Sequence, residues 1–109
     1  MKSGEIWTAS AGGVGYAGKR RPVIILQHKC FSDFNSVILC LVTSSNANAP
    51  YRVHILPSQE NGLKRESWVM TEKIITIPKT NLGKKIGTLE PHYLVAIKQN
   101  VAKLLGIAD

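Results

Sequence analysis

Two runs of consecutive apolar residues constrain most strongly what this chain can fold into. They are Val23-Ile24-Ile25-Leu26 and the stretch from Val37 to Val42. Uninterrupted apolar runs of this length are typical of strands that are buried on both faces. Because only a short polar connection separates them, we expect an antiparallel pair. Pro22 is expected at the first position of its strand, where its missing N–H costs least.

Other β-like segments surround this pair. Further strands are expected at residues 6–8, 52–56 and 67–77. The remaining stretches are predicted as connections: a four-glycine segment at 9–19, polar loops at 30–35, 44–50 and 57–62, and a basic linker at 79–85. We therefore expect a sheet whose strands are short and closely connected.

One helix is predicted, at the C-terminal end. Pro91 suits a first helical position and Gly106 suits a helix end. Apolar residues recur between them at helical spacing, namely Leu94, Ile97, Val101, Leu104 and Leu105. This stripe is expected to pack on the sheet or on a partner subunit. The expected fold is mainly β (α+β): a small curled β-barrel with a C-terminal helix, in a single domain over residues 1–109.

The charge balance points to anionic partners. The chain has 14 Lys and Arg against 7 Asp and Glu, a net charge of +7. Such an excess on a small surface attracts nucleic acid, anionic lipid or an acidic protein. No apolar run approaches the roughly 18–20 residues of a membrane span, and the N-terminal residues lack a signal-peptide core. We therefore expect a cytoplasmic protein with no place in a membrane.

The cysteines and histidines predict neither a metal site nor a cofactor. Cys30 and Cys40 fit no common zinc spacing, and the three histidines are scattered. Cys40 lies inside an apolar run and is expected to be a buried thiol. The chemistry must therefore come from other side chains.

Hairpin geometry brings one arginine and one threonine together. In a simple hairpin, the numbers of two opposed residues always add up to the same sum. A turn centred near Ser32 makes this sum 64. Arg21 would then lie opposite Thr43 at the sheet edge. A guanidinium and a hydroxyl placed there are suited to a phosphate group. The alternative is a solvated strand-end charge next to a threonine that merely ends a strand.

A set of short motifs, in this order, resembles the MazF/PemK family of bacterial toxin–antitoxin toxins. The match spans nearly the whole chain. Its pieces are Gly4-Glu5-Ile6-Trp7, Gly18-Lys19-Arg20-Arg21-Pro22-Val23-Ile24-Ile25, Val42-Thr43-Ser44, Asn61-Gly62-Leu63, Glu66-Ser67-Trp68-Val69, Thr76-Ile77 and Leu104-Leu105-Gly106.

The resemblance implies a homodimeric, metal-independent, sequence-selective endoribonuclease with an SH3-like barrel. It carries the catalytic arginine onto Arg21, the catalytic threonine onto Thr43 and an acidic residue onto Glu72. The chain departs from relatives at Met70, where some carry arginine, and at Gly15-Tyr16-Ala17, where many carry an acidic residue or histidine.

The implied reaction is attack of a ribose 2′-OH on the adjacent phosphorus, which leaves a 2′,3′-cyclic phosphate and a 5′-OH. Arg21 would stabilise the developing charge, and Thr43 would donate a hydrogen bond to the same phosphoryl group. Glu72 is the candidate for proton transfer, with an ion pair to Lys73 or Lys85 as its alternative role.

RNA-binding residues are expected around this site. They are Tyr16, which can stack on a base or fold onto the barrel, together with Lys19, Arg20, Ser44 and Asn46; Asn48, Arg52, Lys64 and Arg65 are further candidates. The alternative for each basic residue is a solvated side chain with no role in RNA binding. Trp68 is expected in the core or at the dimer interface rather than as a base-stacking platform.

Three functions are compatible with such a barrel. The first is an mRNA interferase toxin that acts on single-stranded RNA and is neutralised by an acidic, partly disordered antitoxin. The second is a CcdB-like gyrase poison, although the C-terminal Leu105-Gly106-Ile107-Ala108-Asp109 lacks that group's Trp-Gly-Ile ending. The third is a non-catalytic nucleic-acid-binding barrel. Fold alone does not separate them.

Overall fold

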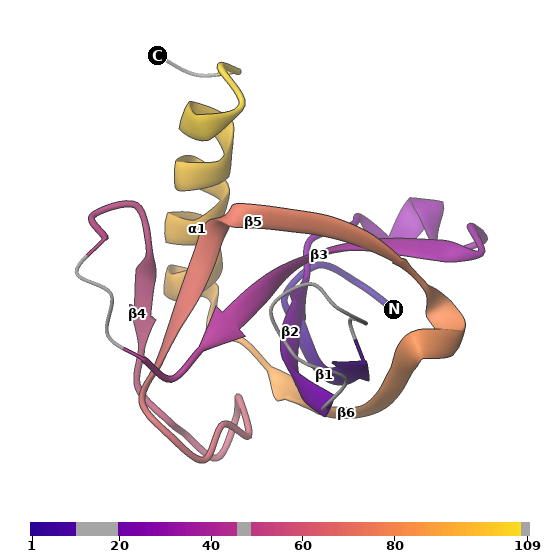
Figure 1. The fold of residues 1–109 in the computed structure, drawn as a ribbon, viewed down its shortest axis with the longest axis horizontal. Coiled ribbons are helices and arrows are strands. Elements are labelled where there is room, and N and C mark those ends of the chain that lie inside the picture. The colour runs from indigo at the N-terminus through magenta and orange to yellow at the C-terminus, as the bar shows by residue number, and fades with distance from the viewer. Residues whose placement is uncertain (11–19, 46–48, 108–109) are drawn as a thin grey trace.

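The computed structural model describes residues 1–10, 20–45 and 49–107 of the chain. These residues form one curled antiparallel sheet with a helix beside it (Figure 1). The elements are β1 (Glu5–Ser10), β2 (Arg20–Ile25), η1 (Lys29–Phe31), β3 (Ser36–Thr43), β4 (Val53–Ile55), β5 (Ser67–Pro78), η2 (Lys79–Asn81), β6 (Leu82–Thr88) and α1 (Pro91–Leu104). The predicted mainly β class with a C-terminal helix is confirmed.

The sheet has the order β4-β5-β3-β2-β1-β6 and curls into a half-barrel (Figure 1). Its central hairpin has the predicted register, since Val23, Ile24 and Ile25 of β2 pair with Leu41, Cys40 and Leu39 of β3. In each of these pairs the two residue numbers add up to the predicted sum of 64. Continued by two residues, this register predicts Arg21 opposite Thr43.

The start of β2 differs from the sequence-based expectation. Strand β2 begins at Arg20, so Pro22 is its third residue and not its first. Pro22 pairs with Thr8 of β1 and therefore lies inside the sheet, one residue before the pair of Val23 with Leu41 of β3.

The predicted linker at 79–85 is wrong. It forms the turn η2 and most of β6, which pairs with β1 from Leu82 to Thr88. Glycines and exposed lysines give this segment little β-propensity of its own, and its strand conformation comes from pairing with β1. The register with β1 shifts on both sides of Trp7, which marks β6 as an irregular edge strand.

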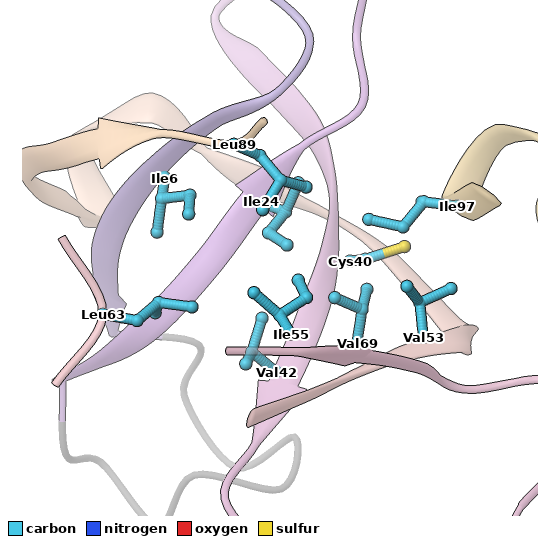
Figure 2. Close-up of a cluster of buried hydrophobic side chains, with 10 residues drawn as sticks. All are labelled: Ile6, Ile24, Cys40, Val42, Val53, Ile55, Leu63, Val69, Leu89 and Ile97. Atoms are coloured by element: carbon cyan, nitrogen blue, oxygen red, sulfur yellow. The ribbon is translucent and has the colours of Figure 1, made fainter. Parts of the chain in front are cut away.

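The apolar core is divided between the two faces of the sheet. The cluster on the helix side, drawn in Figure 2, is Ile6, Ile24, Cys40, Val42, Val53, Ile55, Leu63, Val69, Leu89 and Ile97. The cluster on the other face is Ala9, Val23, Ile25, Val37, Leu39, Leu41, Met70 and Ile77. Residues 23–25 of β2 and 39–42 of β3 therefore alternate between two buried faces, which confirms the prediction for these segments, whereas Ile38 in the second apolar run is 39% exposed.

Cys40 lies in the helix-side cluster, beside Ile97 of α1 (Figure 2). Burial, with a smaller contribution from the charge of Glu72, raises the pKa of the Cys40 thiol to about 12. The predicted buried thiol is thus confirmed, whereas Cys30 is exposed.

Helix α1 begins at Pro91, and Gly106 follows its end with a φ of 73°. There the amides of Gly106 and Ile107 donate to the carbonyls of Lys103 and Ala102. Both predicted boundary signals are therefore confirmed. The apolar stripe packs on the sheet in its first part only, because Leu104 and Leu105 are 46% and 60% exposed.

The connection from β4 to β5 crosses β6 where two glycines meet. Gly62 has a φ of +70°, and a Cβ there would lie 2.1 Å from the carbonyl oxygen of Ile86. A Cβ at Gly87 would lie 2.4 Å from the backbone oxygen of Asn61. The two backbones therefore touch, and this contact carries residues 63–65 to the mouth of the half-barrel.

Candidate active site

An open cavity of about 790 Å³ lies at the mouth of the half-barrel, and strands β1, β2, β3, β5 and β6 all contribute to it. Its described lining includes six cationic side chains: Arg21, Arg52, Lys64, Arg65, Lys73 and Lys84. Hydroxyl groups add hydrogen-bond donors: Thr8, Thr43, Ser44, Ser45 and Ser67. Neither Asp nor Glu is among these lining residues, so the cavity is built to receive an anion.

The structure brings Arg21, Thr43 and Ser44 to this one cavity. Arg21 is exposed on β2, and Thr43 is the half-buried last residue of β3. The amide of Ser45 donates to Thr43 Oγ1 at 3.1 Å. Since that contact occupies an oxygen lone pair, the hydroxyl proton of Thr43 can still be donated to a ligand.

The other predicted RNA-binding residues have different positions. Tyr16, Lys19, Asn46 and Asn48 lie outside the described residues. Arg20 does not line the cavity, and its guanidinium lies beside Gly83 of β6. Neighbouring residues of a strand point to opposite faces, so a strand that directs Arg21 into the cavity directs Arg20 away from it.

Three further basic residues that were considered as binding groups, Arg52, Lys64 and Arg65, do line the cavity. Sequence reasoning missed Lys73 and Lys84 as cavity residues. Lys84 was missed because its segment was taken for a linker, whereas its amide is bound to Thr8 Oγ1 at 3.0 Å in β6. Lys73 lies within an irregularity of β5 that no local signal marks.

Glu72 lies outside the cavity lining and pairs with Arg52. Arg52 Nη2 and Nε donate to Glu72 Oε2 at 2.7 and 3.2 Å. Partial burial opposes ionisation of this carboxyl, but the hydrogen bond and charge of Arg52 outweigh it, so the pKa of Glu72 lies below its ordinary value. The partner of the ion pair is thus Arg52 and not Lys73 or Lys85.

Trp68 is half-buried on β5 and belongs to neither core cluster. Its ring stacks on His54 with centroids 5.0 Å apart, and His54 Nε2 lies 2.8 Å from Glu66 Oε2. Of the two positions expected for Trp68, the core is therefore wrong, and the dimer interface stays a prediction. Trp68 pairs with Thr43 on one side and with His54 on the other, so its side chain lies on the same face of the sheet as theirs.

No group of three or more His, Cys, Asp or Glu that could hold a metal ion occurs in the part of the chain that the structure describes. In the same part, α1 is too short and too polar to cross a bilayer, and no other helix could.

The curled sheet, the terminal helix and the cationic cavity define a small α+β protein equipped to bind an anionic ligand. A family model described as "PemK-like, MazF-like toxin of type II toxin-antitoxin system" matches residues 2–105. The chain therefore belongs to the PemK/MazF toxin family, as the order of its motifs predicts.

Individual relatives and a solved structure agree with this membership. The chain is 37% identical over 109 residues to the probable endoribonuclease MazF of Mycolicibacterium smegmatis, with 99% of each covered. It is 28% identical over 92 residues to endoribonuclease MazF6 of Mycobacterium tuberculosis, covering 82% of this chain and 81% of that protein. A mycobacterial endoribonuclease solved in complex with its cognate antitoxin has the same fold, with a TM-score of 0.82, 22% identity and coverage of 100% and 98%.

Proposed function

We propose that this chain is a MazF-type endoribonuclease toxin that cleaves single-stranded RNA at selected sequences without a metal ion. The observation that carries the proposal is the placement of Arg21 and Thr43 in one cavity whose described lining is cationic and lacks carboxylates. Relatives across nearly the whole length are named endoribonucleases, which supports the same activity.

The reaction breaks one bond and forms one bond at phosphorus. The ribose 2′-oxygen loses its proton and bonds to the phosphorus, while the bond to the 5′-oxygen breaks and that oxygen gains a proton. A 2′,3′-cyclic phosphate and a 5′-OH end remain. Negative charge builds on the phosphoryl oxygens during the step, so groups that stabilise this charge lower the barrier.

Arg21 and Thr43 are assigned to that charge. A guanidinium stays protonated in proteins, so Arg21 acts as a fixed cation and a fork of donors. Thr43 donates its hydroxyl proton to the same phosphoryl group, with its oxygen oriented by the amide of Ser45. Loss of one such donor commonly costs roughly 10²–10³ in rate.

The proposed partners follow from charge and exposed surface. The net charge of +7 and the cationic cavity suit an acidic antitoxin segment that competes with RNA. Exposed Leu104, Leu105 and Ile107 at the end of α1 suit coverage by a second copy in a homodimer. Light scattering during gel filtration tests the dimer, and protection of RNA by the co-expressed antitoxin tests the neutralising partner.

The deciding experiment is incubation with a long single-stranded RNA in excess EDTA, with fragment ends mapped by primer extension. We expect cuts at a recurring short sequence, 5′-OH ends, and losses of about 10²–10³ in Arg21→Ala and Thr43→Ala. Arg20→Ala is the matched control, because Arg20 is adjacent but does not line the cavity. Intact RNA from the folded protein would contradict the proposal and direct the work to a gyrase supercoiling assay.

A further inference from the structure

Strand β5 carries an irregularity beside the cavity. Its pairing with β3 runs from Cys40↔Ile74 directly to Leu41↔Met70, so residues 71–73 are inserted between two successive residues of β3. Such bulges bend a strand and redirect its side chains. Figure 1 shows β5 changing direction along its length, between the first part, which pairs with both β3 and β4, and the later part, which pairs with β3.

The first inserted residue fixes the backbone next to Arg52. Thr71 is fully buried, and its hydroxyl donates to the carbonyl oxygen of Tyr51. Asn100 Nδ2 of α1 donates to the same oxygen at 2.8 Å. The peptide that leads into Arg52 is therefore held by both β5 and α1.

The second inserted residue fixes the Arg52 side chain. Both hydrogen bonds from Arg52 end on one oxygen of Glu72, and the two side chains are only 14% and 24% exposed. Two bonds orient a guanidinium more strictly than one does. They use two of its five N–H donors, so the same group can still donate to another acceptor.

The two members of this pair have different relations to the cavity. Arg52 lines it, as does Lys73, the third inserted residue, whereas Glu72 does not. The carboxylate therefore lies behind the guanidinium and not across the cavity from it. A volume of about 790 Å³ falls in the range that holds a drug-sized ligand, so there is room for more than the one phosphate at Arg21 and Thr43.

We propose that Glu72 is a positioning residue that directs the Arg52 guanidinium into the cavity. There Arg52, with Lys73, binds the RNA phosphate that neighbours the one attacked at Arg21 and Thr43. This inference rests on the proposed function, because it names how the same cavity holds its substrate.

A direct role for Glu72 in proton transfer fits the contacts less well. The Oε2 atom already accepts two hydrogen bonds, and the carboxyl is not part of the cavity lining. Although partial burial opposes ionisation, the bond from Arg52 lowers the pKa of Glu72, and a carboxylate with a lowered pKa is a weaker base.

The first test measures binding without cleavage. An RNA with a 2′-deoxy sugar at the cleaved nucleotide is titrated by fluorescence anisotropy against the wild type, Glu72→Gln, Arg52→Gln and the double variant. We expect Glu72→Gln to weaken binding about tenfold, although it removes a negative charge near a cationic cavity. The double variant should bind like Arg52→Gln alone, since the two residues act as one unit.

Glu66→Gln is the matched control. It makes the same change in net charge at an exposed carboxylate that pairs with His54 and does not line the cavity. We expect its RNA affinity to stay equal or rise. If Glu72→Gln also binds equally or more tightly, the positioning role is wrong, while RNA binding by the wild type leaves the proposed function in place.

Kinetics and substrate chemistry complete the test. On cleavable RNA, Glu72→Gln should raise KM about tenfold with kcat within about threefold, whereas loss of a proton-transfer group would lower kcat by 10²–10⁴ and overturn the proposal. Single methylphosphonate linkages placed along the RNA should include one next to the cleaved bond that weakens wild-type binding but not that of Arg52→Gln. If each linkage weakens RNA binding by the wild type and by Arg52→Gln equally, Arg52 does not contact a flanking phosphate.

Failure of the wild type to bind or cleave any RNA would instead reject the proposed function itself.

Discussion

The two walls of the cavity are built in different ways. The near wall, Arg21 and Thr43, stands at the end of a regular hydrogen-bonded ladder between β2 and β3. The far wall, Arg52 and Lys73, depends on an insertion in β5 and on side-chain bonds made by its residues. Backbone pairing therefore places the proposed catalytic pair, whereas a few side-chain hydrogen bonds, each weak by itself, place the proposed binding pair.

The largest expected effect is on stability, and it compares substitutions behind the two walls. Leu39→Ala removes a fully buried side chain from the ladder behind the near wall and should lower the free energy of unfolding by about 2–5 kcal/mol. Thr71→Val removes one hydrogen bond behind the far wall and should cost about 1–3 kcal/mol. Urea unfolding measures both values. An equal or greater loss in Thr71→Val would mean that the far wall is tied into the fold as firmly as the ladder.

The next effect separates the walls by kinetics. Arg21→Lys keeps the charge but loses the planar fork, so we expect kcat to fall about 10²-fold. Thr43→Ser keeps the hydroxyl and should stay within about tenfold of the wild type. Arg52→Lys should change mainly KM. Initial rates on a defined RNA measure all three, and a fall in kcat for Arg52→Lys as large as that for Arg21→Lys would remove the distinction between the walls.

The smallest expected effect concerns pH. The pKa of Glu72 in the folded protein lies below its ordinary value, about 4.3 in an unfolded chain. Its ion pair with Arg52 therefore stabilises the fold fully above that ordinary value, and the contribution is lost as pH falls through the lower, folded pKa. For a single ion pair at the protein surface we expect about 0.2–1 kcal/mol.

The measurement compares the free energy of unfolding of the wild type and Glu72→Gln at pH 6 and pH 3. The difference between them should shrink at the lower pH. A gap that stays constant or widens in acid would show that the carboxylate is not stabilised by Arg52.

The near wall could be predicted from the sequence because it follows from counting. Two apolar runs and a short turn define a hairpin, and the absence of a bulge between Val23 and Ile25 keeps the sum of opposed residues constant. The two ends of α1 could also be predicted from the sequence, because Pro91 and Gly106 act through their own backbone geometry. In both cases local residues alone determine the structure.

Of the far wall, Arg52 was a candidate binding residue, but Lys73 and the pair of Arg52 with Glu72 could not be predicted, for physical reasons. Nothing in the side chains of Thr71, Glu72 and Lys73 distinguishes an inserted segment from ordinary alternation in a long strand. The partner of Glu72 is 20 residues away along the chain, on a segment whose position depends on Thr71 and Asn100. Likewise, Lys84 reaches the cavity only because β1 imposes a strand on a glycine- and lysine-rich segment.

The crossing of Gly62 over Gly87 has a consequence for how this protein tolerates variation. Neither residue offers a side chain to RNA, yet a Cβ at Gly62 would lie 2.1 Å from a backbone oxygen and a Cβ at Gly87 would lie 2.4 Å from one. A saturation library selected for loss of toxicity should therefore recover many replacements at these two positions, alongside those at Arg21 and Thr43. The cationic cavity is therefore kept only in variants that retain glycine at both Gly62 and Gly87.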